Sequence, residues 1–140
     1  MRRTRRQRGA AILEFALAWP VALLLVLGCV ELAVWGAESF AARAAALAGA
    51  RAASVAGSSP RIAEIVTMRV LAPSLVGVQA GAWCPGQDGP TPVVWVCAKE
   101  LGSAVQVDVG GSVPALVPVG FQNGLPLHAH VEIHQEAFAT

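Results

Sequence analysis

The clearest pattern in this chain is a change from basic to apolar residues at Gly9. Five of the first eight residues are arginines, and the chain then runs apolar to Val30 with one interruption, Glu14. About 20 apolar residues are enough for a helix to cross a bilayer. A carboxylate inside such a span costs about 2.5–3.5 kcal/mol on insertion scales, so we expect Glu14 to have a partner.

The apolar run continues as an alanine-rich segment, and together they predict one helix from Ala10 to about Ser54. At 1.5 Å per residue this helix is on the order of 65 Å long, about twice the hydrocarbon thickness of a bilayer. It must therefore project from the membrane. Pro20 removes a hydrogen bond from the Ala16 carbonyl and is expected to bend the span, although prolines are also tolerated in spans without a functional effect.

Small side chains recur every four residues in the projecting half, at Ala37, Ala41, Ala45 and Gly49. Such a stripe permits the close approach of another helix. Alanine is also the best helix former, so the stripe has a second explanation that needs no partner.

The helical pattern breaks at residues 57–60, where Ser59 suits an N-cap and Pro60 the first helical position. A short amphipathic helix is predicted from Arg61 to about Leu71, with its apolar face packed onto a later sheet. The residues of that face are Ile62, Ile65, Val66 and Val70.

The second half of the chain predicts a small antiparallel sheet. Strand-like runs occur at 93–98, at 104–109, where a glycine pair ends the run, and at about 127–135. The intervening residues 112–126 contain three prolines and several apolar clusters, which predict an apolar loop or a partner-facing surface. The expected fold class is therefore α+β, with a long N-terminal membrane-spanning helix, a short helix and this sheet.

These elements divide the chain into four parts. Residues 1–9 are expected to be a cytoplasmic leader, and residues 10–36 the transmembrane half of the N-terminal helix. Residues 37–56 form the exposed, alanine-rich half, and residues 57–140 a small α+β head.

The composition fits a membrane-anchored chain, because 55% of the residues are hydrophobic and only 14% are charged. The net charge of +1 hides an asymmetry: without the five leader arginines, five positive and nine negative side chains remain, a net charge of −4 (5 − 9). No basic surface for nucleic acid is left. By the positive-inside rule the arginines stay in the cytoplasm, which places the head in the periplasm or outside the cell.

The cysteines agree with that topology. Cys29 lies in the apolar span and should be an inert small hydrophobe, whereas Cys84 and Cys97 flank a Gly/Pro-rich loop of the head. In an oxidising compartment we expect these two to pair, which would stabilise the head by about 3 kcal/mol in the chain-entropy model. Two thiols are too few for the alternative, a structural zinc site. Trp83 and Trp95 are expected to form the core around the disulfide, or else an exposed binding surface.

One polar cluster near the C-terminus needs to be weighed as a metal site. Alternation places five polar side chains on one face of the last strand: His128, His130, Glu132, His134 and Glu136. A His-x-His pair can chelate a metal, but the solvent-facing side of a half-buried strand explains every one of these residues without it. No serine lies in a nucleophile-elbow context and no glycine run forms a phosphate loop, so we expect no metal, no cofactor and no enzyme.

The order of these pieces resembles a type IV pilin-like precursor: a basic leader, a glycine, four small or apolar residues, then Glu-Phe. The run from Arg8 to Ala16, followed by Pro20, a leucine cluster, Gly28 and Glu31, is similar to the TadE family of minor pseudopilins. A second similarity is the Gly-Ala-Arg at residues 49–51. The resemblance covers about residues 8–51.

The resemblance implies processing and assembly. A prepilin peptidase would cut between Gly9 and Ala10, and Glu14, with Phe15 beside it, would pair with the new α-amine of a neighbouring subunit. The implied partners are that peptidase, other pilin and pseudopilin subunits, the inner-membrane assembly platform and membrane lipid. The implied role is assembly of a Tad-type pilus for surface adhesion, from a single-pass position in the inner membrane.

Two alternatives remain from the residues themselves. An uncleaved anchor would make the chain a periplasmic binding or scaffolding module, with the arginines acting only as a topology signal. A secretory signal peptide also has a basic start and an apolar core, but its core is usually about 7–15 residues long and has no reason to carry an acid at its cytoplasmic edge.

Overall fold

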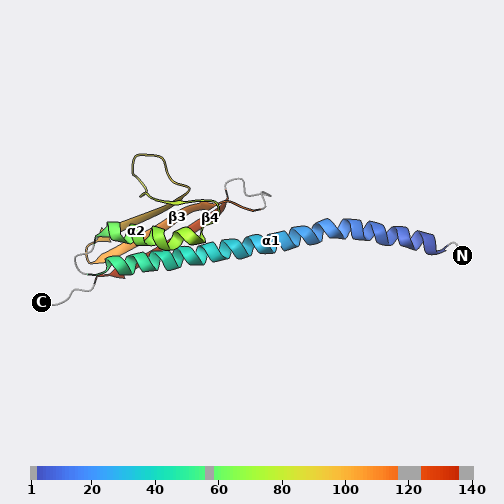
Figure 1. Cartoon of the computed structure of the whole chain (residues 1–140), viewed down its shortest axis with the longest axis horizontal. Coiled ribbons are helices and arrows are strands. Elements are labelled where there is room, and N and C mark those ends of the chain that lie inside the picture. The colour runs from blue at the N-terminus through green and yellow to red at the C-terminus, as the bar shows by residue number, and fades with distance from the viewer. Residues whose placement is uncertain (1–2, 56–58, 117–123, 136–140) are drawn as a thin grey trace.

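The computed structural model describes residues 3–55, 59–116 and 124–135, and the side chains from residue 12 onward within these ranges. Its largest element is α1 (Arg3–Ala53), one helix of 51 residues. The predicted single helix is therefore confirmed, although it begins within the arginine cluster. Pro20 lies inside α1, and Figure 1 shows the helix axis changing direction in the blue N-terminal part.

The second helix, α2 (Pro60–Leu71), starts where the sequence predicted, with Ser59 at the N-cap and proline in the first turn. It packs against α1 through Ala63 and Thr67, which are both fully buried. The predicted apolar face is wrong, because Ile62 and Ile65 remain 43% and 46% exposed. Close packing on α1 requires small side chains at the contact, and this requirement sets the orientation of α2 and leaves the larger residues outside.

Part of the small-residue stripe of α1 packs against the head of the same chain. Ala45 and Gly49 are buried against the head, whereas Ala37 is exposed. Gly49 lies directly opposite Thr67, where a Cβ atom would meet the threonine hydroxyl and approach the Ala63 carbonyl oxygen to 2.6 Å. The small side chains at 45 and 49 thus let α2 approach α1 closely.

After the short 3-10 turn η1 (Ala72–Ser74), four strands form one sheet in the order β1-β2-β3-β4. The strands are β1 (Ala80–Ala82), β2 (Val94–Leu101), β3 (Ala104–Val113) and β4 (Leu125–His134). β2, β3 and β4 pair antiparallel, as predicted, but β1 runs parallel to β2, so the sheet is mixed. The α+β fold is confirmed. The sequence missed β1 because its three small residues show no alternation.

The glycine pair that was expected to end β3 instead lies inside it, and the strand continues to Val113. Gly110 leaves room for the Trp95 ring. Gly111 has a φ of 132°, and a Cβ atom there would overlap the Val93 carbonyl oxygen. Both glycines are therefore explained by close packing with β2 and the residue before it.

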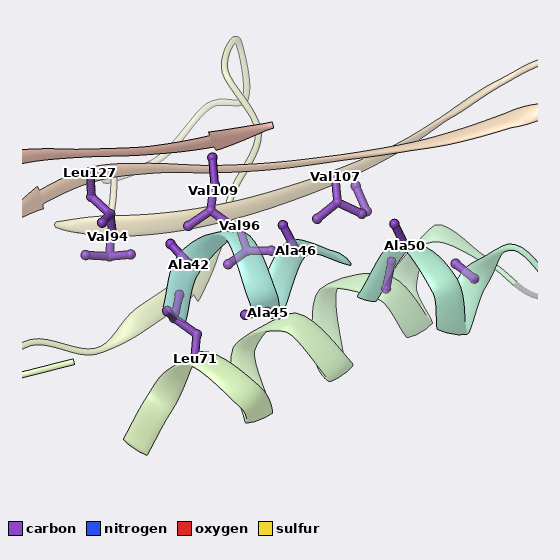
Figure 2. Packing of buried hydrophobic residues seen from close by; sticks show 14 of the residues in the cluster. Ala42, Ala45, Ala46, Ala50, Leu71, Val94, Val96, Val107, Val109 and Leu127 are labelled. Carbon is purple, nitrogen blue, oxygen red and sulfur yellow. The ribbon is translucent and has the colours of Figure 1, made fainter. Parts of the chain in front are cut away.

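Both helices cover the same face of the sheet, and the core lies between these two layers (Figures 1 and 2). Figure 2 shows the alanines of α1 facing aliphatic side chains from the strands. The labelled core residues are Ala42, Ala45, Ala46, Ala50, Leu71, Val94, Val96, Val107, Val109 and Leu127. The loop between β1 and β2 stands on the opposite face of the sheet (Figure 1).

Gly49→Ala should lower the free energy of unfolding of the head. Overpacking costs about 1–3 kcal/mol, which exceeds the gain of about 1 kcal/mol in helix propensity. Gly36→Ala is the matched control, since nothing lies within 4 Å of its Cβ position and only the propensity gain applies. Denaturant titration of the full chain in detergent measures both; equal stabilisation by the two variants would contradict the close helix contact.

Candidate assembly site on the N-terminal helix

The N-terminal half of α1 is apolar and uncovered. From Ile12 to Val30 the residues are exposed, apart from the partly covered Gly28, and Phe15 and Leu25 reach 67% and 66%. The most apolar window of Ile12–Ala53 has a mean hydropathy of 2.3, with only 6% of it buried. A soluble core helix would be covered by its own protein, so this helix fits a membrane anchor.

Glu14 is the one charged side chain in this uncovered half. It is exposed, and within the part of the chain that the structure describes it makes no hydrogen bond or ion pair. Phe15 follows it and stacks on Trp19 one turn later, with ring centroids 6.0 Å apart. Gly9 and Ala10 lie in α1, but their surroundings fall outside what the structure describes. One helical turn, about 6 Å along the axis, separates positions 10 and 14.

Three hydrogen bonds connect the described part of the head to α1, at positions 31, 35 and 38 of the helix. Leu116 N donates to Glu31 Oε1 at 3.0 Å, and Val76 N donates to Glu38 Oε1 at 3.1 Å. Between them Trp35 Nε1 donates to the carbonyl oxygen of residue 126 at 2.9 Å. Both carboxylates are buried, at 8% and 3% exposure, and each satisfies a backbone N–H that would otherwise lack an acceptor.

Sequence reasoning missed the face of α1 that contacts the head, which we call the seam. It used Glu31 only for the family pattern and assigned no role to Glu38. The available signal was the spacing: steps of four and three residues connect these positions to the buried alanines higher on the same helix face. The members of this face are Glu31, Trp35, Glu38, Ala42, Ala45 and Gly49. The described part of the head therefore packs on α1 along one helix face.

The structure contains the disulfide that the sequence predicted, Cys84–Cys97, with Cα atoms 4.8 Å apart. Trp83 and Trp95 lie beside it, edge to face, with ring centroids 5.9 Å apart. Both rings are half-buried, so they belong to a small second cluster on the sheet face opposite the helices. This cluster fixes the β1–β2 loop to β2.

The polar face of β4 is exposed, as its alternation predicted. His130 Nδ1 lies 2.6 Å from Asp108 Oδ1 on the neighbouring strand, and Gln106 donates to the other carboxylate oxygen. Among the residues that the structure describes, no group of three or more His, Cys, Asp or Glu side chains is arranged to hold a metal ion. Glu136 lies outside the described residues. The exposed His130–Asp108 pair makes a surface contact of small energy.

One of three comparisons with known proteins found a match, and that match lies on the helix. A family model described as TadE-like protein matches residues 9–51, which include the whole uncovered half and the seam. Searches of curated proteins and of solved structures found no match. The resemblance drawn from the sequence is thus confirmed for this segment, which is consistent with a TadE-like, pilin-like protein.

Proposed function

From the TadE-like match of its helix, we propose that this chain is a minor pilin or pseudopilin of a Tad-type pilus, with a structural rather than a catalytic role. One observation carries the proposal. The helix presents an apolar surface from Ile12 to Val30 that its own head leaves uncovered, and the only charge in that surface, Glu14, has no partner among the described residues. Lipid can cover such a surface before assembly, and the helices of neighbouring subunits can cover it after assembly.

The arginine cluster determines the position of the helix in the membrane before cleavage. Each arginine would have to cross the apolar layer if the subunit moved outward, so the leader holds the chain at the cytoplasmic face. A prepilin peptidase that cuts between Gly9 and Ala10 removes this tether. It also leaves an α-amine on Ala10, which carries a positive charge or nearly so at neutral pH.

Glu14 then pairs with the α-amine of a neighbouring subunit. Either charge alone is costly in an apolar helix bundle, so the pair favours one register of docking. In parallel helices the one-turn distance between positions 10 and 14 sets the axial offset of the partner at about 6 Å, adjusted by the reach of the glutamate side chain. Phe15 and the apolar residues beyond it supply packing area.

The proposed topology places the head in the periplasm or outside the cell. The 21 residues from Ala10 to Val30 span about 30 Å, the thickness of the hydrocarbon layer. The Cys84–Cys97 disulfide suits an oxidising compartment. The proposed partners are other pilin subunits and the inner-membrane assembly platform, and the proposed outcome is a pilus that serves surface adhesion.

Fractionation of cells tests this function. With an epitope tag at the C-terminus, the protein should appear in sheared surface pili when the prepilin peptidase is active, and only in the membrane fraction when the peptidase gene is deleted. A membrane-only location in both strains, with pili present in the first, would contradict the pilin role and favour a permanently anchored module.

A further inference from the structure

A hollow of about 230 Å³ lies on the part of α1 that projects beyond the proposed span. It is lined by Trp35, Gly36, Ser39, Phe40 and Arg43. Gly36 keeps the hollow open, because nothing lies within 4 Å of the position that a Cβ atom would take there. A cavity of about 150 Å³ can hold benzene, so this hollow has room for one aromatic ring.

The hollow lies on a different side of α1 from the head. Glu38, which is buried under the head, follows Gly36 by two residues, and two residues turn a helix by about 200°. Trp35 stands at the border between the two sides, because its Nε1 bonds to the head while the residue also lines the hollow. The described part of the head therefore leaves the hollow open to a neighbouring molecule.

Phe40 projects from the edge of this hollow into water. It is 75% exposed, the largest fraction among the large apolar side chains that the structure describes. If Ala10–Val30 fills the hydrocarbon layer, Phe40 stands about 15 Å beyond the boundary of that layer, whereas the headgroups extend for only about 5–8 Å. Lipid therefore does not cover this ring, and a protein partner is needed to remove it from water.

The spacing of the ring and the hollow repeats the spacing of the proposed charge pair. Gly36 and Phe40 are four residues apart, as are Ala10 and Glu14, and α1 is continuous through both pairs. Glu14 and Gly36 are 22 residues apart (36 − 14), about six turns, which places them on the same side of a regular helix. In parallel helices, the axial offset that brings Glu14 to the neighbouring Ala10 also brings Phe40 to the neighbouring Gly36.

We propose that the hollow receives Phe40 from α1 of a second copy of this chain, as a knob-into-hole contact outside the membrane. The inference rests on the pilin function and the charge pair proposed above. A second copy is the occupant because one side of α1 carries both the projecting ring and the hollow, at the offset that the charge pair sets. Trp35 and Arg43 suit such a guest, since an aromatic edge and a guanidinium both interact favourably with the face of a ring.

Two contacts on one helix define the register of docking better than one contact does. Glu14 and Phe40 are 26 residues apart (40 − 14), about 39 Å along the axis. The charge pair alone lets two helices pivot about it, whereas a second contact at this distance keeps them close to parallel. Phe40 is thus a positioning residue that stays in water until a neighbouring subunit docks.

Disulfide cross-linking in sheared pili tests the contact. Two differently tagged copies of the full chain, both with Cys29→Ser, are produced in the same cells, one with Gly36→Cys and the other with Phe40→Cys. The matched control replaces Gly36→Cys with Ala37→Cys, at the next and exposed position of the helix. All three substituted positions are open enough to leave the fold intact. After oxidation with copper phenanthroline, immunoblotting measures the dimer that carries both tags.

The expected yield of the 36–40 dimer is several-fold higher than that of the 37–40 dimer. Equal yields, in pili that contain both tags, would overturn the contact and leave the charge pair untouched. Loss of both tags from the sheared pili would instead overturn the pilin function on which the contact rests.

A change of volume on each side of the contact gives a second test. Gly36→Leu fills the hollow and should lower incorporation into pili several-fold, whereas Ala37→Leu adds the same bulk at the next position and should assemble normally. Phe40→Ala alone should also lower incorporation. In the double variant with Gly36→Leu, the smaller side chain meets the filled hollow, so incorporation should recover in part. Losses that simply multiply in the double variant would contradict a direct contact.

Discussion

Glu14→Ala is expected to abolish incorporation into pili while leaving membrane insertion and leader cleavage intact. The variant removes the one carboxylate of the uncovered helix surface, so the α-amine of a neighbouring Ala10 would enter the bundle unpaired. An unpaired charge in such a setting costs about 3–5 kcal/mol, which corresponds to a loss of roughly a hundredfold or more in incorporation. Quantitative immunoblotting of sheared pili measures the loss.

Two matched variants separate charge from packing. Glu14→Gln keeps the shape of the side chain and should fail as Glu14→Ala does. Leu13→Ala removes a neighbouring exposed side chain without any change of charge, and it should assemble at close to the native level because most of the apolar surface remains. Normal pilus content in Glu14→Ala would remove the charge pair from the mechanism.

Reduction of Cys84–Cys97 should lower the free energy of unfolding of the head by about 3 kcal/mol in the chain-entropy model. The bond closes the loop between β1 and β2 and ties it to a buried position, because Cys97 is only 1% exposed. A head of this size has a modest core, so the loss is a large part of its stability. Denaturant titration by tryptophan fluorescence, with and without dithiothreitol, measures the difference.

The control for reduction is the third cysteine. Cys29 is free and exposed on the span, so Cys29→Ser should leave the unfolding midpoint of the head unchanged under both conditions. The double variant Cys84→Ser with Cys97→Ser should match the reduced protein in lacking the loop constraint. If the oxidised and reduced proteins unfold at the same denaturant concentration, the disulfide does not support the head.

Elements with a strong periodic pattern could be predicted from the sequence. The alternation along β4 correctly separated the buried Ala129 from the exposed histidines. The end of the long helix and the start of α2 followed from proline, glycine and serine chemistry. These signals are local, because each depends on neighbouring residues of one segment.

The features that the sequence missed depend on contacts between segments. The face that α2 buries is decided by the absence of a side chain at Gly49, on the other helix. The large side chains of Ile62 and Ile65 had pointed to the wrong face, because they remain exposed. Glu31 and Glu38 look like ordinary surface charges of a helix until the head supplies N–H donors for them. The candidate assembly site was predictable because Glu14 stands out against an apolar run.

The intact mass of the protein extracted from membranes tests the central claim most directly. In cells with an active prepilin peptidase, the account predicts a chain that begins at Ala10, without the arginine-rich leader and with its α-amine free. N-terminal sequencing should give the same start. A chain that still begins at Met1 in those cells would contradict the account, since the arginines would remain as a tether and Glu14 would have no new amine to pair with.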